Sequence, residues 1–385
     1  MKAIINGRII HRKEIVEDAI LYFDQKILGL SREVPAENCE IIDASGLYVS
    51  AGFVDMHIHG SGGADVMDAT PEALETISVA LMEGGTTSFV ATTMTMGQEE
   101  IEAALDNVVQ HASEVTGAKI RGIHLEGPFL NPNKSGAQDS RYIQEANFDW
   151  ITPYLEQIRV ITIAPEIKGA EAFIKRLSVS HPHILLSIGH SDAGYDTALE
   201  SFDWGISHAT HLFNAMPPFQ HRAPGIVGAV LDSSVTVEII ADLIHLHPSI
   251  VRMVHDLKKE KLILITDAMR AGCMGSGIYE LGGQKVIVSD GRAILENGVL
   301  AGSVLRLNEA VKNYRDVSMA TLAEAVYAAT TLPARRLGLS CGELEEGYDA
   351  DIILFDTQLD IKELYIDGAI KYRQERESRE VSHAK

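Results

Sequence analysis

Cysteine is scarce in this chain of 385 residues, which contains only Cys39, Cys273 and Cys341. Three widely spaced cysteines cannot form a disulfide framework or a CxxC metal site, and they fit a reducing compartment. No apolar run approaches the length of a membrane span, and polar residues interrupt the N-terminal stretch too early for a signal-peptide core. We therefore expect a cytoplasmic protein.

Basic residues are also in short supply. Lys and Arg number 33 against 54 Asp and Glu, so the net charge is −21. Such a charge disfavours unspecific binding to nucleic acid or to anionic membrane surfaces, and an anionic substrate would need a local basic pocket. The chain also lacks GxGxxG, a P-loop and a GxSxG nucleophile elbow. The corresponding nucleotide-binding and serine-hydrolase sites are therefore not expected.

Apolar, strand-like runs alternate with helical stretches through the middle of the chain. Eight runs are predicted as strands, at residues 53–58, 87–92, 120–125, 160–164, 184–188, 205–210, 235–241 and 262–266. Segments between them, such as 71–83 and 99–114, have helical periodicity. Eight such units predict an α/β fold of the (β/α)8 TIM-type barrel class, with a doubly wound sheet as the alternative.

Both ends of the chain have a different character, with short strand-like runs separated by turns. We expect the two ends to pair into one small β-sandwich domain, formed by residues 1–50 and 342–380, beside a barrel of residues 51–341. The tail from Gln374 is charged and is expected to be loose.

Residues of metal-ligand type cluster near the ends of the predicted strands. They are His57, His59, His124, Glu126, Glu166, His190, His208, His211, Asp242, His245 and Asp267. The His-x-His motif alone is weak, because 15 histidines give about 0.6 such pairs by chance and the chain has three. In a barrel, however, these strand ends form one rim, where barrel enzymes hold their chemistry. Their order along the chain therefore favours a functional site.

Glu126, His190 and His211 come from three different predicted strands. One carboxylate and two imidazoles with a fourth position open are what a catalytic zinc-type site needs, although each histidine alone would more often be a core residue. Such an ion polarises a carbonyl and lowers the pKa of its bound water. On the same rim, Asp267 is the natural general base, and a helix N-cap is its structural alternative.

Two loops offer groups that can bind an anion. In so acidic a protein, Arg222 with His221 or His245 could hold a phosphate or a carboxylate, and a solvated surface arginine is the alternative. Residues 300–303 follow a hairpin-like stretch at about 275–299. Their backbone N–H groups could bind an anion or a hydroxyl.

Together, these motifs resemble the N-acetylglucosamine-6-phosphate deacetylases of the amidohydrolase superfamily. The resemblance covers nearly the whole chain, including the terminal strands. It rests on His57-Ile-His59, His124-Leu-Glu126-Gly-Pro, Gly189-His190-Ser-Asp, His208-Ala-Thr-His211-Leu-Phe-Asn-Ala-Met and Thr266-Asp267-Ala.

The resemblance implies that Glu126, His190 and His211 bind a catalytic divalent ion, Zn²⁺ or Fe²⁺, and that Asp267 is the acid/base. In this family the phosphate-binding arginine comes from the neighbouring subunit, which implies a homodimer with Arg222 in the partner's active site. The implied contacts to the sugar phosphate are Ala137, Gln138, Asn214, Ala215, His221, Arg222, Asp242, His245, Leu300, Ala301 and Gly302.

The chain departs from one group of these enzymes at two positions. Members with a single metal lack the His-x-His of the first strand and carry a histidine where this chain has Gln138. Because both histidines are present here, we predict a second ion held by His57 and His59, with Glu126 bridging the two ions.

The predicted reaction is metal-dependent hydrolysis of the acetamide of N-acetyl-D-glucosamine 6-phosphate, giving D-glucosamine 6-phosphate and acetate. A metal-bound hydroxide attacks the carbonyl and Asp267 moves the proton to the departing amine. One alternative is a deacetylase for another N-acetylated amino-sugar phosphate, such as the galactosamine series. The other is a non-catalytic scaffold, against which the complete ligand set and Asp267 argue.

Overall fold

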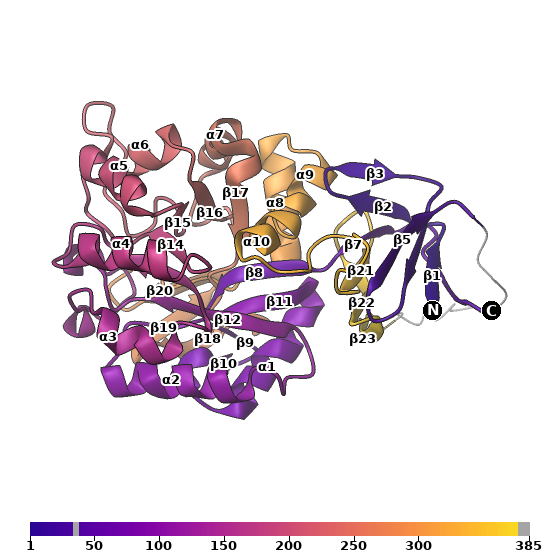
Figure 1. Cartoon of the computed structure of the whole chain (residues 1–385), viewed down its shortest axis with the longest axis horizontal. Helices are drawn as coiled ribbons and strands as arrows, with labels where there is room; N and C mark the ends of the chain where they lie inside the picture. Colours follow the sequence, from indigo (N-terminus) through magenta and orange to yellow (C-terminus); the bar gives the residue numbers. More distant parts are fainter. Residues whose placement is uncertain (34–37, 376–385) are drawn as a thin grey trace, which may run out of the picture.

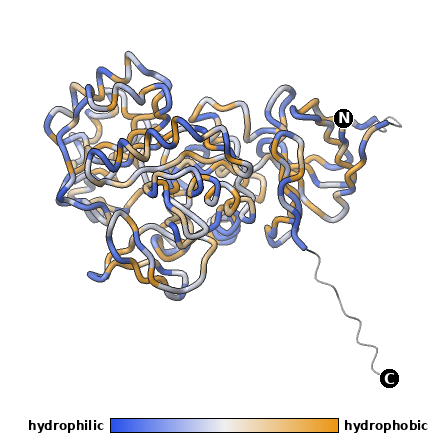
Figure 2. Tube along the Cα trace, turned by 90° about the horizontal axis from the view of Figure 1, so that it is seen from below, coloured by the Kyte–Doolittle hydropathy of each residue, from blue (hydrophilic) through white to orange (hydrophobic). Residues whose placement is uncertain are grey.

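The structure is a computed structural model that describes residues 1–33 and 38–375. Two units lie side by side along the long axis of the molecule (Figure 1, Figure 2). The larger unit is built on a parallel barrel, and the smaller unit contains strands from both ends of the chain. None of the helices in these described ranges is both long and apolar enough to cross a membrane.

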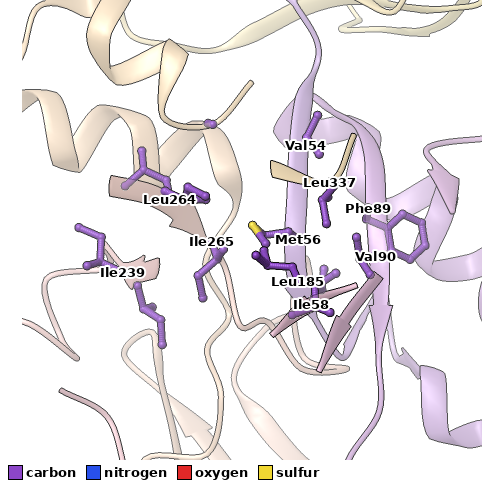
Figure 3. Packing of buried hydrophobic residues seen from close by; sticks show 14 of the residues in the cluster. Val54, Met56, Ile58, Phe89, Val90, Leu185, Ile239, Leu264, Ile265 and Leu337 are labelled. Atoms are coloured by element: carbon purple, nitrogen blue, oxygen red, sulfur yellow. The ribbon is translucent and has the colours of Figure 1, made fainter. Parts of the chain in front are cut away.

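Eight parallel strands form the barrel and follow one another in sequence order, which excludes a doubly wound sheet. Most of their residues are buried, as in a parallel sheet that is covered on its outer face. All eight predicted strands are confirmed: β8 (Phe53–Ile58), β11 (Thr86–Thr92), β12 (Lys119–Glu126), β13 (Ile158–Ile163), β14 (Leu185–Ile188), β15 (His208–Ala209), β16 (Thr236–Ile240) and β17 (Leu262–Ile265). Figure 3 shows side chains of β8, β11, β14, β16 and β17 in the apolar core.

The sixth strand is shorter than predicted. We expected residues 205–210, but β15 contains only His208 and Ala209. Gly205 has a φ of 130° and ends helix α5, so the chain cannot yet be extended there. The two-residue strand still pairs with both neighbours.

Helices follow the strands and surround the barrel (Figure 1). They are α1 (Pro71–Leu81), α2 (Gln98–His111), α3 (Phe148–Ile151), α4 (Ala170–Ser180), α5 (Tyr195–Trp204), α6 (Gly225–Asp232), α7 (Pro248–Lys258), α8 (Leu307–Ser318), α9 (Leu322–Tyr327) and α10 (Thr331–Arg336). The helical segments expected at 71–83 and 99–114 correspond to α1 and α2.

The barrel closes between its first and last strands, β8 and β17. At the carboxyl end of this seam, the Asp267 amide donates to the His57 carbonyl at 2.9 Å, and the Thr266 hydroxyl donates to Asp55 at 2.6 Å. At the other end, the carbonyls of Ala328 and Ala329 accept from the amides of β17 and β8. The seam therefore places Asp267 directly beside the His-x-His motif.

The smaller unit consists of two sheets packed around a separate apolar core. One sheet has the order β5-β4-β1-β6 and the other β23-β22-β21-β7-β2-β3. The bounds are β1 (Lys2–Ile5), β2 (Arg8–His11), β3 (Glu14–Val16), β4 (Ile20–Phe23), β5 (Ile27–Ser31), β6 (Glu40–Asp43), β7 (Tyr48–Ala51), β21 (Ile352–Phe355), β22 (Ile361–Ile366) and β23 (Ala369–Arg373). Strands from both ends therefore share this unit, as the sequence predicts.

The exact division at 50/51 and 341/342 remains a prediction. Residues 376–380 of the predicted small domain, and most of the predicted loose tail, lie outside the described residues.

An antiparallel sheet is inserted between β17 and α8. The predicted hairpin-like stretch forms β18 (Gly277–Leu281), β19 (Gln284–Ser289) and β20 (Arg292–Leu295). One face of this sheet packs on Met94 and Met269 in a third apolar cluster. Gln284 Nε2 also donates to the Ala137 carbonyl at 2.6 Å, which ties the sheet to the loop after β12. A short pair, β9 (Gly60–Ser61) and β10 (Ala64–Asp65), follows β8.

Ion pairs join the barrel to the smaller unit. Lys119 Nζ lies 3.2 Å from Asp349, 3.0 Å from Asp351 and 2.6 Å from Asp367, and Arg121 contacts the first two. The three carboxylates are close enough to share a metal ion, but Lys119, Arg121 and Lys26 already neutralise them. We therefore interpret this cluster as structural.

Replacing Lys119 by Met should lower the free energy of unfolding by about 2–3 kcal/mol, because among the described residues it leaves the buried Asp351 with Arg121 as its only remaining cation. Urea denaturation measures this change. The matched control is Lys285→Met, which removes the exposed pair with Glu296 and should change stability by less than about 0.5 kcal/mol. Equal effects of the two variants would contradict the assignment.

Candidate active site

Five potential ligands and one carboxylate acid/base candidate gather at the carboxyl rim of the barrel. His57 lies in β8 and His59 directly follows it, and Glu126 is the last residue of β12. His190, His211 and Asp267 each lie two residues beyond the ends of β14, β15 and β17. The structure thus brings together all six residues that the sequence placed there.

The three residues that follow strand ends share an uncommon backbone conformation. The φ angles are 47° at His190, 28° at His211 and 48° at Asp267, in the left-handed region that favours glycine. Such conformations cost free energy and concentrate at functional sites, where surrounding structure holds them. Here non-glycine residues occupy them, which is expected where the side chain itself is needed.

The first group of ligands meets around Glu126 Oε1. His190 Nε2 lies 3.2 Å from this oxygen, His211 Nε2 lies 3.0 Å from it, and the two nitrogens are 3.1 Å apart. Ligands about 2.0–2.1 Å from a tetrahedral zinc are separated by about 3.3–3.4 Å, so these spacings are close to one face of a coordination tetrahedron.

The second group shares Glu126 and adds the histidines of the first strand. His59 Nε2 lies 3.2 Å from Glu126 Oε2, and His57 Nε2 lies 3.4 Å from Glu126 Oε1. Asp267 Oδ1 lies 3.2 Å from His59 Nε2 and 3.4 Å from His57 Nε2. The carboxylate of Glu126 therefore faces both groups.

Hydrogen bonds on the far side of two rings show where their lone pairs point. His190 Nδ1 lies 2.9 Å from the Lys134 carbonyl, which can only accept, so Nδ1 carries the hydrogen. His57 Nδ1 likewise donates to Glu238 at 3.0 Å. In the neutral rings, Nε2 then presents a lone pair to Glu126. His57 Nε2 is buried without a hydrogen-bond partner among the described residues. This donor set fits a cation.

The carboxylates make the site strongly favourable for positive charge. Burial lowers the pKa of His59, but hydrogen bonds to Asp267 and Glu126 outweigh it and raise the pKa to about 9. Burial raises the pKa of Glu126, yet His57 and the other imidazoles hold it well below its usual value. A divalent cation would compete with the protons for the same imidazole lone pairs.

Three other residues at the predicted strand ends make different contacts. His124 Nε2 hydrogen-bonds with Thr162 at 2.7 Å, and burial lowers its pKa to about 3, so the ring stays neutral inside the barrel. His208 contacts Glu238 at 3.1 Å. Glu166 accepts from Ser191 and from the Asp192 amide, which secures the loop after His190.

A cavity of about 370 Å³ opens at these candidate ligands. Of the expected sugar-phosphate contacts, seven line it: Ala137, Gln138, Asn214, Ala215, His245, Leu300 and Gly302. A wider hollow of about 920 Å³ lies on the smaller unit, but it shares no lining residue with this cavity and contains no comparable ligand set.

Four expected contacts do not line the cavity of this chain. Ala301 is fully buried, and Asp242 accepts from His245 Nδ1 at 2.7 Å and so orients that ring. His221 and Arg222 are exposed, on the loop after Met216. One chain alone therefore leaves its cavity without the predicted arginine.

Gln138 has a role that the resemblance did not indicate. Its Oε1 accepts from the Thr95 amide at 2.6 Å, and its Nε2 donates to Glu126 Oε2 at 2.8 Å. Both ends of the amide are therefore used to hold the Glu126 carboxylate, although the side chain also borders the cavity.

Sequence reasoning missed Glu238 and the apolar wall of the cavity. Met94 and Leu281 form part of this wall, from the loop after β11 and from the inserted sheet. Nothing in their local sequence marks them. Glu238 did carry a signal, since it is a charged residue within the apolar run Val-Thr-Val-Glu-Ile-Ile at 235–240.

The left-handed conformation of Asp267 predicts an order of stability. In metal-free protein, Asp267→Gly should be more stable than Asp267→Ala by about 1 kcal/mol, because only the Ala side chain is strained at a φ of 48°. Urea denaturation of both variants measures the difference. At the neighbouring Ala268, which is not left-handed, Ala268→Gly should instead be destabilising. An Ala variant at 267 as stable as the Gly variant would contradict the strain.

Comparisons with known proteins agree with this geometry. The amidohydrolase family matches residues 48–375. An N-acetylglucosamine-6-phosphate deacetylase from Lysinibacillus sphaericus is 40% identical over 356 residues, covering 90% of this chain and 92% of that protein. An N-acetylgalactosamine-6-phosphate deacetylase from Escherichia coli O157:H7 is 35% identical over 326 residues, covering 83% and 86%.

The similarity holds for the three-dimensional structure as well. The crystal structure of an N-acetylglucosamine-6-phosphate deacetylase from Pasteurella multocida superimposes with a TM-score of 0.91 at 30% identity, covering 97% of this chain and 100% of that one. The match therefore includes the barrel and the terminal strands alike. The chain belongs to the amidohydrolase family and, within it, to the N-acetylglucosamine-6-phosphate deacetylases.

Proposed function

We propose that this protein hydrolyses the acetamide of N-acetyl-D-glucosamine 6-phosphate to D-glucosamine 6-phosphate and acetate, with a divalent metal, Zn²⁺ or Fe²⁺. The observation that carries the proposal is the convergence of Glu126, His190 and His211 near Asp267 in the wall of one cavity. The similarity to deacetylases over nearly the whole chain supports the choice of substrate.

We further propose two ions per chain. Glu126, His190 and His211 would hold the first, and His57 and His59 the second, with Glu126 shared between them. The support is geometric, because Glu126 belongs to both groups of closely spaced ligand atoms. A divalent cation at this site activates water and polarises the acetamide carbonyl.

Asp267 would handle the proton in this reaction. Its carboxylate borders the cavity, 3.2 Å from His59. Burial raises the pKa of Asp267, but His57 and His59 outweigh it and hold the pKa below its usual value. The group therefore begins ionised, as a base that takes a proton from water and returns it to the departing amine nitrogen.

The polar groups around the cavity would orient the sugar phosphate. His245, fixed by Asp242, offers Nε2 to a hydroxyl or phosphate oxygen. Asn214 and Ala215, on the loop after β15, line the same cavity and would lie against the bound sugar phosphate.

We propose a homodimer in which Arg222 binds the phosphate in the partner's active site. Arg222 is exposed, does not line its own cavity, and has no ion-pair partner among the described residues, in a protein with a net charge of −21. We also propose a cytoplasmic location, which the three free cysteines favour.

Acetate release should separate the candidate substrates. We expect turnover of N-acetyl-D-glucosamine 6-phosphate, much weaker turnover of unphosphorylated N-acetylglucosamine, and loss of both after chelation, with recovery when Zn²⁺ or Fe²⁺ is restored. The 6-phosphate of N-acetylgalactosamine is the third substrate, because a relative carries that name. Faster turnover of the galactosamine substrate would favour that alternative. If no substrate released acetate, the protein would have to be interpreted as a non-catalytic scaffold.

Mixed dimers test the shared site. Arg222→Ala and Asp267→Asn homodimers should both be nearly inactive at low substrate concentration, since the first lacks the phosphate contact and the second the proton carrier. A co-expressed heterodimer, purified by two different tags, would contain one site with an intact Asp267 and the partner's intact arginine. We expect that site to be active. An inactive heterodimer would show that Arg222 serves its own chain or neither site.

A further inference from the structure

Glu238 is a buried carboxylate beneath the active site. It lies in the middle of β16, and its side chain is completely inaccessible to solvent. Burying an ionised carboxylate is costly unless hydrogen bonds compensate for the lost water. The groups that bind Glu238 therefore indicate why it is there.

The partners of Glu238 belong to both groups of metal-ligand candidates. Its Oε2 accepts from His57 Nδ1 at 3.0 Å and from the backbone amide of His211 at 3.1 Å. Its Oε1 accepts from His208 Nε2 at 3.1 Å. The backbone carbonyl of Glu238 also accepts from the Leu212 amide at 2.9 Å. No metal-ligand role of its own is available, because both carboxylate oxygens are taken by donors.

These contacts fix the proton on His57. An ionised carboxylate only accepts, so Nδ1 of His57 carries the hydrogen and Nε2 of the neutral ring keeps its lone pair. That Nε2 atom faces Glu126 and Asp267 at 3.4 Å. With the other tautomer, a hydrogen would occupy the place of the second ion.

We propose that Glu238 is a positioning residue of the metal centre, which holds His57 in the Nδ1–H tautomer and presents its Nε2 atom to the second ion. The proposal rests on the two-ion site proposed above. Glu238 also steadies the His211 backbone, but that amide does not choose a tautomer, so the larger effect falls on the second ion. Hydrogen-bonded carboxylates of this kind commonly set the orientation of metal-binding imidazoles.

Two substitutions separate orientation from charge. In Glu238→Gln, the amide oxygen can still accept from His57 while its nitrogen donates to His208. The His208 ring can then change tautomer and donate from Nδ1 to the Thr236 hydroxyl, which lies 2.7 Å away. In Glu238→Met, no acceptor remains. If Glu238 acts by orienting His57, Glu238→Gln should weaken binding of the second ion mildly and Glu238→Met severely. If only its negative charge matters, the two variants should weaken that binding equally.

The test is calorimetric titration of the metal-free full chain with Zn²⁺. Wild type should bind two ions, and Glu238→Met should weaken the second by about 10–100-fold with a smaller change at the first. Glu238→Gln should weaken binding of the second ion by less than Glu238→Met does. The control is Ser187→Ala, which removes a buried hydroxyl that hydrogen-bonds to Thr210 at 2.6 Å and to none of the five proposed metal ligands. It should leave both affinities unchanged.

Imidazole ¹⁵N spectra of Glu238→Gln keep the proposal testable if the Met variant does not fold. Recorded on Zn²⁺-loaded protein, they should show His57 protonated on Nδ1 and not on Nε2, and His208 changed to its Nδ1–H tautomer. The proposal would be overturned if the Gln and Met variants lost equal affinity for the second ion, if both ions were weakened equally, or if neither affinity changed. A proton on Nε2 of His57 in these spectra would also overturn it. Wild type that binds one ion yet releases acetate would also overturn it, while leaving the proposed deacetylase activity intact.

Discussion

The constraint on which the active site depends is the burial of the Glu126 carboxylate among four imidazoles. Its two oxygens lie 3.0–3.4 Å from the Nε2 atoms of His57, His59, His190 and His211. At least two of those rings donate from Nδ1 to other groups, so in their neutral form their Nε2 atoms present lone pairs to Glu126. Lone pairs and a carboxylate repel one another in a low-dielectric interior unless a cation lies between them. Protons on the imidazoles, or a divalent ion that displaces them, remove this repulsion, and such an ion would supply the chemistry of an amide hydrolase.

The barrel supplies this arrangement by bringing five strand ends to one rim. Closure at the seam of β8 and β17 sets Asp267 against His57, and left-handed backbone turns at His190, His211 and Asp267 direct their side chains to the rim. Beneath them, Glu238 on β16 links the first strand to the loop of His211. The scaffold thus holds the proposed ligands through buried hydrogen bonds, which would preorganise the site before a substrate binds.

Much of this site could be read from the sequence, because barrel topology converts order along the chain into proximity at the rim. The runs that end at His57, Glu126 and Asp267 were continuous and apolar, and these strands were found with nearly correct bounds. The sixth strand was overestimated because Gly205 ends a helix where the apolar pattern suggested a strand. The left-handed turns and the use of Gln138 to hold Glu126 depend on tertiary contacts, which no local pattern encodes. Arg222 raises a different problem, since its proposed partner lies on a second chain.

The central claim is that Glu126 bridges two ions at this rim. The most direct measurement is the activity of metal-free protein during titration with Zn²⁺ or Fe²⁺, with bound metal counted at every step. The account predicts that acetate release reaches its plateau at two ions per chain. A plateau at one ion per chain, with no further rise as more metal binds, would contradict it.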